Sequence, residues 1–300
     1  MMILFFALSG CDILNGLDSL PEKEKIIDFI YSMQIVDPDQ GSRRSGFTGS
    51  RCCGCKFDSA KSDLHHFDSS HVTMTYTALC SLLILGDDFT RVDKSSILKG
   101  LAALESKIIP GSYQAGIYCP EADSRFIYSA VCSAYILGDV SIFNKERLLK
   151  YFQSVHTYEG GFARDPCLEA HAGITFCVLA SAKLLNILDD LMPKNSQRRD
   201  SLIKWLVSSQ TEGCHGRTNK PDDSCYTFWV GASLSILEVP NLLHSEELLK
   251  FIKKTYHTFL GGISKVPHAL PGICNDFQNW TMDFIDEVNA NDSFLSDLTG

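Results

Sequence analysis

Hydrophobic residues follow two alternating helical patterns along this chain. In the first pattern most faces are apolar, which is typical of a buried helix. This pattern covers residues 71–85, 126–137, 171–188 and 225–237. In the second pattern apolar residues recur at i, i+1, i+4 and i+7 and the other faces are charged, as expected for a helix with one exposed side. Examples are Ile97, Leu98, Leu101 and Leu104. Strand-type alternation is scarce, so the sequence predicts an all-α fold.

Glycine-containing turns separate these helices at a nearly constant spacing. From residue 111 onward the leading glycines stand 49, 53 and 48 residues apart, at Gly111, Gly160, Gly213 and Gly261. Repeats that pair a buried helix with an exposed one indicate stacked helical hairpins. We expect a double-layered ring of inner and outer helices, with an open solenoid as the alternative. We also expect Asn144 and Ser245 to cap two of the outer helices.

In such a ring the inner helices direct their N-terminal ends at one mouth of a central cavity. Helix N-termini carry unpaired N–H groups and attract anions. Chemically active side chains gather just after the glycine turns, at His71, Arg125, His171, Asp223 and Cys225. We therefore expect the functional site at this mouth.

Composition limits the classes of function. Of the 300 residues 45% are hydrophobic, which is enough for a substantial core in one large domain or two small ones. The net charge of −9 argues against nucleic acid as a partner, because phosphate contacts need a basic surface. Many of the 12 cysteines, such as Cys80, Cys132 and Cys177, lie inside apolar helical patterns, where a reduced cysteine packs as a small hydrophobe. We therefore expect a cytoplasmic protein with reduced thiols.

The N-terminal run MMILFFALSGC allows two interpretations. Its end resembles a bacterial lipid-attachment box, but no Lys or Arg precedes the run, which is very short for a signal peptide. We favour a helix that packs in the core. No other apolar run approaches the roughly 20 residues that span a bilayer, so we expect no membrane span. The stretch CCGC at 52–55 has no second cysteine pair at a suitable spacing, and we expect a loop without a metal cluster.

The stretch RTNKPDDSCYTFWVG combines several kinds of chemistry. Asp223 and Cys225 stand two residues apart at a predicted helix start, where a carboxylate and a thiolate can bind Zn²⁺. The alternative is an N-cap aspartate followed by a buried cysteine. Arg217 and Lys220, together with His171, can clamp a diphosphate. The alternative is a solvated basic loop and a capped core histidine.

Aromatic residues on the predicted inner helices suit either a pocket for a long lipid or plain core packing. They are Tyr76, Tyr128, Phe176, Tyr226, Phe228 and Trp229.

Eight motifs are spread between residues 3 and 267. They read FFALSGCDIL, IYSMQ, GFTGS, DSSHVTMTYTALCSLLILGDD, SRFIYSAVC, EGGFARDPCLEAHAGITFC, GCHGRTNKPDDSCYTFWVG and GGISKVP. Together they resemble the β subunits of protein prenyltransferases, most closely the type I geranylgeranyltransferase β subunit. The resemblance implies an α–α toroid that forms a heterodimer with a helical-repeat α subunit. It also implies transfer of geranylgeranyl from its diphosphate to the cysteine of a C-terminal C-a-a-X motif, in proteins such as small GTPases.

The resemblance assigns roles to individual residues. Asp223 and Cys225 match two ligands of a zinc ion. The residues that match the diphosphate site are His171, Arg217, Lys220, Tyr226 and Lys265. Arg125 matches an arginine at the mouth of the active site, near the C-terminal end of the substrate peptide.

Lys265 also bears on the metal requirement. Farnesyltransferase has a Mg²⁺-binding aspartate at this position, whereas the type I geranylgeranyl enzyme has a lysine. A fixed ammonium can neutralise the leaving diphosphate, so the resemblance implies geranylgeranyl transfer without Mg²⁺. Arg217, Lys220 and Lys265 would be the catalytic cations, while zinc holds the acceptor cysteine as a thiolate.

Both ends of the chain depart from the family pattern. The start corresponds to the second helix of the family, so we expect one N-terminal helix fewer. The third zinc ligand of the family is a histidine shortly after the GGxxK turn, and His268 comes too early to match it. We expect a toroid over residues 1–271, incompletely closed at the C-terminus. Residues 272–300 carry six carboxylates and no Lys or Arg, which is typical of a divergent, disordered acidic tail.

Two alternatives stay open. One is a catalytically impaired variant subunit that lacks the third zinc ligand and still binds the α subunit. The other is a terpene-cyclase-like toroid that acts on lipid alone, although no DxDD-type acid cluster is present in the sequence.

Overall fold

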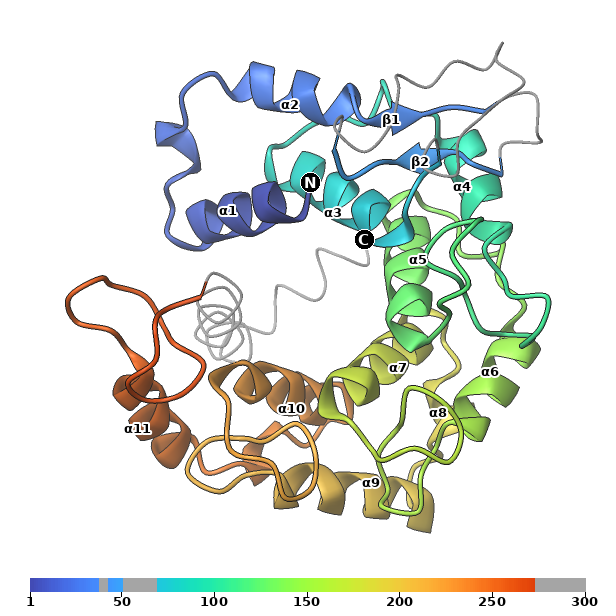
Figure 1. Cartoon of the computed structure of the whole chain (residues 1–300). Helices are drawn as coiled ribbons and strands as arrows, with labels where there is room; N and C mark the ends of the chain where they lie inside the picture. The colour runs from blue at the N-terminus through green and yellow to red at the C-terminus, as the bar shows by residue number, and fades with distance from the viewer. Residues whose placement is uncertain (38–42, 51–68, 273–300) are drawn as a thin grey trace.

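The computed structural model describes residues 1–37, 43–50 and 69–272, which form a two-layered arc of helices (Figure 1). The inner layer consists of α1 (Met2–Ile13), α3 (Val72–Ile84), α5 (Ser124–Ile136), α7 (Ala172–Leu184) and α10 (Ser224–Ile236). The outer layer consists of α2 (Lys23–Tyr31), α4 (Lys94–Ala102), α6 (Lys145–Ser154), α9 (Gln197–Ser208) and α11 (Ser245–Thr255). The connections contain η1 (Leu17–Ser19), β1 (Gln34–Ile35), β2 (Gly46–Phe47), α8 (Leu188–Leu191) and η2 (Pro240–Leu242). The predicted alternation of inner and outer helices is confirmed.

The inner helices pack in sequence order, α1 on α3, α3 on α5, α5 on α7 and α7 on α10. The two ends of the arc, α1 with α2 and α10 with α11, face each other on the left of Figure 1. No described helix follows α11, so the arc of described helices is open between α11 and α1. The cysteine-rich stretch at 52–55 and the acidic tail, apart from Gly272, lie outside the described residues.

The N-terminal run forms the helix α1 that we expected to pack in the core. Leu8 is 2% exposed, and the ring of Phe5 lies 6.0 Å from that of Tyr76 on α3. None of the helices in the described ranges is both long and apolar enough to cross a bilayer. The interpretation of this run as a core helix is therefore confirmed.

Four buried serines mark equivalent positions on the inner helices. Each hydroxyl donates to the carbonyl four residues earlier, at 2.6–2.7 Å, so each is satisfied within its own helix. They are Ser81, Ser133, Ser181 and Ser233, and all are 0% exposed. A small side chain that needs no outside partner lets neighbouring inner helices approach closely, which explains polar residues in a core.

Short antiparallel contacts close the turn after each outer helix. The strands β1 and β2 pair after α2, and single bridges join Glu105 to Tyr113, His156 to Phe162, Gln210 to Cys214 and Tyr256 to Ile263. The predicted glycine turns lie within these hairpins. At Gly160, φ is +108° and an added Cβ would lie 2.6 Å from the carbonyl oxygen of Ser201, so the turn requires glycine.

Backbone hydrogen bonds join each of several inner helices to the loop of the next repeat. The first residue of α3, Val72, donates to the carbonyl of Ala115 at 2.8 Å. Ala172 donates to Gly216 at 2.9 Å, and Ser224 donates to Lys265 at 3.0 Å. These bonds use N–H groups that a helix start leaves unpaired. They bring the loops after the hairpins to one mouth of the arc, as we expected.

Two local predictions differ from the structure. The helix predicted to run to residue 188 ends at Leu184, because Asn186 adopts a positive φ of 55° and turns the chain into α8. Asn144 caps α6 as predicted, accepting from the N–H of Arg147 at 3.0 Å. The prediction for Ser245 is wrong, because Ser245 is the first residue of α11 and its N-cap is His244.

Candidate active site

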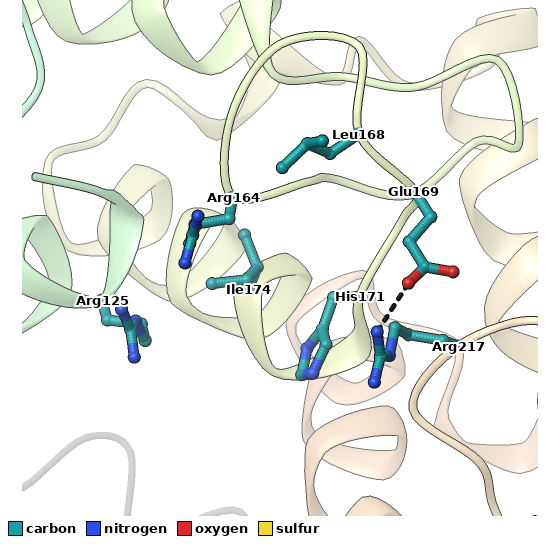
Figure 2. Close-up of a pocket in the computed structure, with 7 residues that line it drawn as sticks. All are labelled: Arg125, Arg164, Leu168, Glu169, His171, Ile174 and Arg217. Carbon is teal, nitrogen blue, oxygen red and sulfur yellow. Dashed lines mark hydrogen bonds and ion pairs between the residues drawn. The ribbon is translucent and has the colours of Figure 1, made fainter. Parts of the chain in front are cut away.

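A cavity of about 360 Å³ lies at the mouth of the arc, in front of the N-terminal end of α7 (Figure 2). Its lining residues come from loops and helix starts that are far apart in the sequence. They are Arg125, Arg164, Leu168, Glu169, His171, Ile174 and Arg217. Three guanidinium groups and an imidazole therefore surround one cavity, a composition that suits an anionic ligand.

His171 is held in one orientation and one tautomer. It is the N-cap of α7, and its Nδ1 accepts a hydrogen bond from the N–H of Gly173 at 3.1 Å. Burial lowers the pKa of His171, and the charge of Arg217 lowers it further, so the ring is neutral near pH 7. Because Nδ1 accepts, the proton of the neutral ring is on Nε2.

Tyr226 completes this pair from the first turn of α10. Its Oη lies 3.2 Å from His171 Nε2, and the two rings meet edge to face at 5.7 Å. Burial, with smaller contributions from Cys225 and Asp223, raises the pKa of Tyr226 to about 12. The phenol is therefore protonated and accepts from His171, which leaves its own O–H to donate to a ligand.

Arg217 approaches the cavity from the loop before α10. Its Nη1 lies 2.6 Å from Oε1 of Glu169, the contact drawn in Figure 2. This ion pair fixes one side of the guanidinium and leaves Nε and Nη2 as further donors. Lys220 follows on the same turn and is exposed, with its N–H 3.2 Å from the carbonyl of Arg217. Its ammonium has no ion pair within the described part of the chain.

Asp223 and Cys225 lie together at the start of α10. Asp223 is the N-cap, 6% exposed, and its Oδ1 accepts from the N–H of Cys225 at 3.1 Å. Burial raises the pKa of Cys225 well above its usual range, and the neighbouring carboxylate of Asp223 acts in the same direction. The N-cap aspartate that we considered as part of the alternative is thus present, whereas Cys225 is partly rather than fully buried. The same two donors remain chemically suited to zinc.

Lys265 places a cation beside this pair. Its Nζ lies 3.5 Å from Oδ2 of Asp223, and its side chain is otherwise largely exposed. His268, in contrast, lines a different cavity together with Lys254 and Tyr256. Within residues 1–37, 43–50 and 69–272 no group of three or more His, Cys, Asp or Glu side chains is placed to hold a metal.

Arg125 is bound on two sides by carboxylates. Its Nη2 lies 2.6 Å from Asp123 and 2.7 Å from Glu121, and Asp123 also caps α5. These contacts hold the guanidinium at the edge of the cavity. Our sequence interpretation did not include Arg164 and Glu169, although both line the cavity, because isolated charges in a loop follow no periodic pattern.

The aromatic residues of the inner helices form a continuous row of contacts. Ring centroids lie 5.7 Å apart for Tyr76 and Tyr128, 5.4 Å for Tyr128 and Phe176, and 5.1 Å for Phe176 and Trp229. Phe228 is 5.5 Å from Phe176. The row crosses α3, α5, α7 and α10 and gives this layer a long apolar surface.

Comparison with known proteins identifies the family. The profile of the prenyltransferase alpha-alpha toroid domain matches residues 1–277. The geranylgeranyl transferase type-1 subunit beta of Dictyostelium discoideum is 36% identical over 291 residues, covering 92% of this chain and 80% of that protein. The Arabidopsis thaliana protein of the same name is 31% identical over 292 residues, covering 94% and 76%.

A solved structure, Candida albicans protein geranylgeranyltransferase-I complexed with GGPP, has a TM-score of 0.81 and 21% identity. The match covers 96% of this chain and 84% of that chain, and it confirms the predicted α–α toroid fold. The family profile covers all the described residues, and the relatives are subunits of prenyl-transferring enzymes. This chain therefore belongs to the prenyltransferase α–α toroid family.

Proposed function

We propose that this chain is the β subunit of a type I protein geranylgeranyltransferase. In this reaction a geranylgeranyl group passes from its diphosphate to the cysteine of a C-terminal C-a-a-X motif. The proposal depends on one observation: anion-binding side chains lie at the same mouth of the arc as a carboxylate and a thiol that could bind zinc. His171, Tyr226 and Arg217 come from two neighbouring repeats, and Asp223 and Cys225 begin the helix that carries Tyr226.

The diphosphate binds among the cationic and hydroxyl groups of this mouth. Tyr226 donates its phenolic proton, and Arg217 offers the nitrogens that Glu169 leaves free. Lys220 and Lys265 add ammonium groups from the loops on either side of the α10 start. These donors stabilise the charge that builds on the diphosphate as the carbon–oxygen bond breaks. Because Lys265 supplies a fixed positive charge, the reaction does not require Mg²⁺.

Asp223 and Cys225 are the proposed zinc ligands. Catalytic zinc sites use three protein ligands and keep one position open, so this site needs one ligand beyond these two. When bound, zinc holds the acceptor cysteine as a thiolate at neutral pH. Since the pKa of Cys225 is raised by burial and by Asp223, zinc binding must release its proton.

The row of aromatic rings supplies the surface for the isoprenoid. The main chain of a geranylgeranyl group has 16 carbons, with four methyl branches, so it is about 20 Å long when extended at the length of ordinary carbon–carbon bonds. The row crosses four inner helices whose neighbouring axes lie roughly 8–10 Å apart. The lipid can therefore lie across several repeats with its diphosphate at the mouth.

The protein partners are a prenyltransferase α subunit and C-a-a-X proteins such as small GTPases. The eight cysteines within the described ranges are free thiols, which suits the cytoplasm.

Transfer by the purified complex tests this function. The chain is produced together with an α subunit and assayed with geranylgeranyl diphosphate and a peptide that ends in Cys-aliphatic-aliphatic-Leu. We expect transfer without added Mg²⁺ and one zinc per complex. The variant Lys265→Asp should lose activity without Mg²⁺ and regain part of it when Mg²⁺ is added, whereas Lys253→Asp, on the outer helix α11, should not. Transfer that is unaffected by Lys265→Asp would contradict the proposed role of this cation.

Two results would favour other functions. Stable assembly with the α subunit, with less than stoichiometric zinc and no transfer, would identify a catalytically impaired subunit, in line with the two candidate ligands seen in the described residues. Conversion of the lipid diphosphate without any peptide would identify a toroid that acts on lipid alone.

A further inference from the structure

Arg164 lines the cavity at the mouth, yet the proposed function gives it no part. It lies in the loop between the His156–Phe162 bridge and α7, and the N–H of the preceding Ala163 donates to the carbonyl of Val155 at 2.9 Å. In Figure 2 its guanidinium lies between Arg125 and His171, on the opposite side of His171 from Arg217. The loop is therefore anchored to the repeat, and its arginine extends to the cavity.

The three guanidinium groups differ in which nitrogens they have left for a ligand. Arg125 uses both Nε and Nη2 on the carboxylates of Asp123 and Glu121. Arg217 uses Nη1 on Glu169. Arg164 uses only Nε, on Oδ2 of Asp165 at 2.9 Å.

Both terminal nitrogens of Arg164 thus lack a protein partner within the described ranges. They present the parallel pair of donors that binds two oxygens of a carboxylate or phosphate at once. The ion pair with Asp165 fixes the plane of this fork without occupying it. Of the three arginines, Arg164 also has the most exposed side chain, at 57% against 49% for Arg125 and 41% for Arg217.

The surroundings of Arg164 indicate an anion that carries an apolar group. Leu168, which is 47% exposed, and Ile174 line the same cavity, and in Figure 2 both lie on one side of Arg164, with Ile174 next to its guanidinium. A free inorganic ion gains nothing from apolar side chains beside it, whereas each substrate of the proposed reaction carries an apolar group next to its anionic group. One is a lipid diphosphate, and the other is a peptide whose last residue carries a carboxylate next to an aliphatic side chain.

We propose that Arg164 is a further substrate-binding residue. Its free terminal nitrogens bind an oxyanion of one of the two substrates, and Leu168 and Ile174 contact the apolar group beside that oxyanion. This inference rests on the proposed function for the identity of the substrates. It does not depend on zinc or on Mg²⁺.

A purely structural role fits Arg164 poorly. Its side chain is 57% exposed, and its one ion pair is with the adjacent Asp165, whose side chain is 38% exposed. Exposed ion pairs of this kind contribute little to folding stability. Arg147 on the outer helix α6 provides a matched control, because its side chain is 51% exposed and pairs with one carboxylate, Glu105, at 3.1 Å, but it does not line the cavity.

The test compares Arg164→Gln, Arg164→Lys and Arg147→Gln in the complex with the α subunit. KM is measured for geranylgeranyl diphosphate, for a peptide ending in a free carboxylate, and for the same peptide with a C-terminal amide. A charge-assisted, two-point contact predicts a rise in KM of roughly tenfold or more for Arg164→Gln, with partial recovery in Arg164→Lys and an unchanged melting temperature.

The pattern of KM identifies the oxyanion. A rise for the lipid diphosphate alone assigns Arg164 to the diphosphate. A rise for the free-acid peptide but not for the amide assigns it to the peptide carboxylate. KM values for both substrates within twofold of wild type, as expected for Arg147→Gln, would overturn the proposal. If the wild-type complex transfers no lipid, the proposed function fails, and calorimetric binding of the same three ligands to wild type and Arg164→Gln then decides the role of Arg164.

Discussion

A methyl group added at Gly216 should act directly on the candidate active site. An ideal Cβ at this position would lie 2.0 Å from Cζ and 2.5 Å from Oη of Tyr226. Carbon atoms in contact are normally about 3.5–4.0 Å apart, so the ring must move by roughly 1.5 Å. Its Oη lies 3.2 Å from Nε2 of His171, and a movement of this size breaks that hydrogen bond. Gly216→Ala is thus a change in the loop that displaces the phenol.

The magnitude follows from two contributions. Forcing an extra carbon into a packed site costs about 1–3 kcal/mol, and the half-buried ring of Tyr226 can yield, so the lower part of this range applies. The lost hydrogen bond costs about 1 kcal/mol. We expect the free energy of unfolding to fall by about 2 kcal/mol. Loss of a donor to the diphosphate should also slow transfer by about 10- to 100-fold, since 1.4 kcal/mol corresponds to a factor of 10.

Chemical unfolding and single-turnover transfer measure the two effects. Tyr226→Phe is the matched variant, because it keeps the ring and removes only the hydroxyl, so it should slow transfer with a smaller loss of stability. In a Tyr226→Ala background the clash disappears, and Gly216→Ala should then cost less than about 0.5 kcal/mol. An equal cost of Gly216→Ala in both backgrounds would refute the reasoning.

Two further predictions concern stability. Burial lowers the pKa values of His71, His156 and His171, so each of these histidines binds a proton more tightly in the unfolded chain than in the folded one. Their contribution to the free energy of unfolding should be fully present above the unfolded pKa of about 6.5. Below that pH the free energy of unfolding should fall, by up to about 1.4 kcal/mol per pH unit for each histidine. Equal free energies of unfolding at pH 7.5 and 5.5 would contradict this prediction. Asn144→Ala removes a cap and should cost about 1 kcal/mol in denaturant unfolding, while Ser245→Ala, which removes none, should stay within about 0.5 kcal/mol.

The helical framework follows closely from the sequence because periodic burial leaves a periodic pattern. The helix predicted over residues 71–85 is observed as Val72–Ile84, with His71 as its cap. The exception is α7, where apolar residues continue past the helix end. Leu185, Ile187 and Leu188 are buried as expected, but the positive φ of Asn186 reverses the chain between them. Hydrophobicity records burial, and it does not record whether the backbone stays helical.

The candidate site follows from the sequence only where its residues belong to a helix start. His171 and Tyr226 stand at fixed positions in the first turns of α7 and α10, so the repeat itself brings them together. The partner of Arg217 is different, since Glu169 comes from a loop 48 residues away and the contact depends on how two loops fold. Neither Glu169 nor Arg164 has a local pattern that distinguishes it from a solvated surface charge.

The backbone hydrogen bonds that join several inner helices to the loop of the next repeat form a seam, and this seam affects how the mouth can change during evolution. Val72, Ala172 and Ser224 are tied to the next repeat through the carbonyl oxygens of their partners, and any amino acid supplies a carbonyl oxygen. At residue 265 the backbone closes the seam while the side chain extends toward Asp223. Mutation there can exchange one charge for another and leave the architecture intact. Single substitutions at this position can therefore change the charge beside the start of α10 while the ring of helices stays the same.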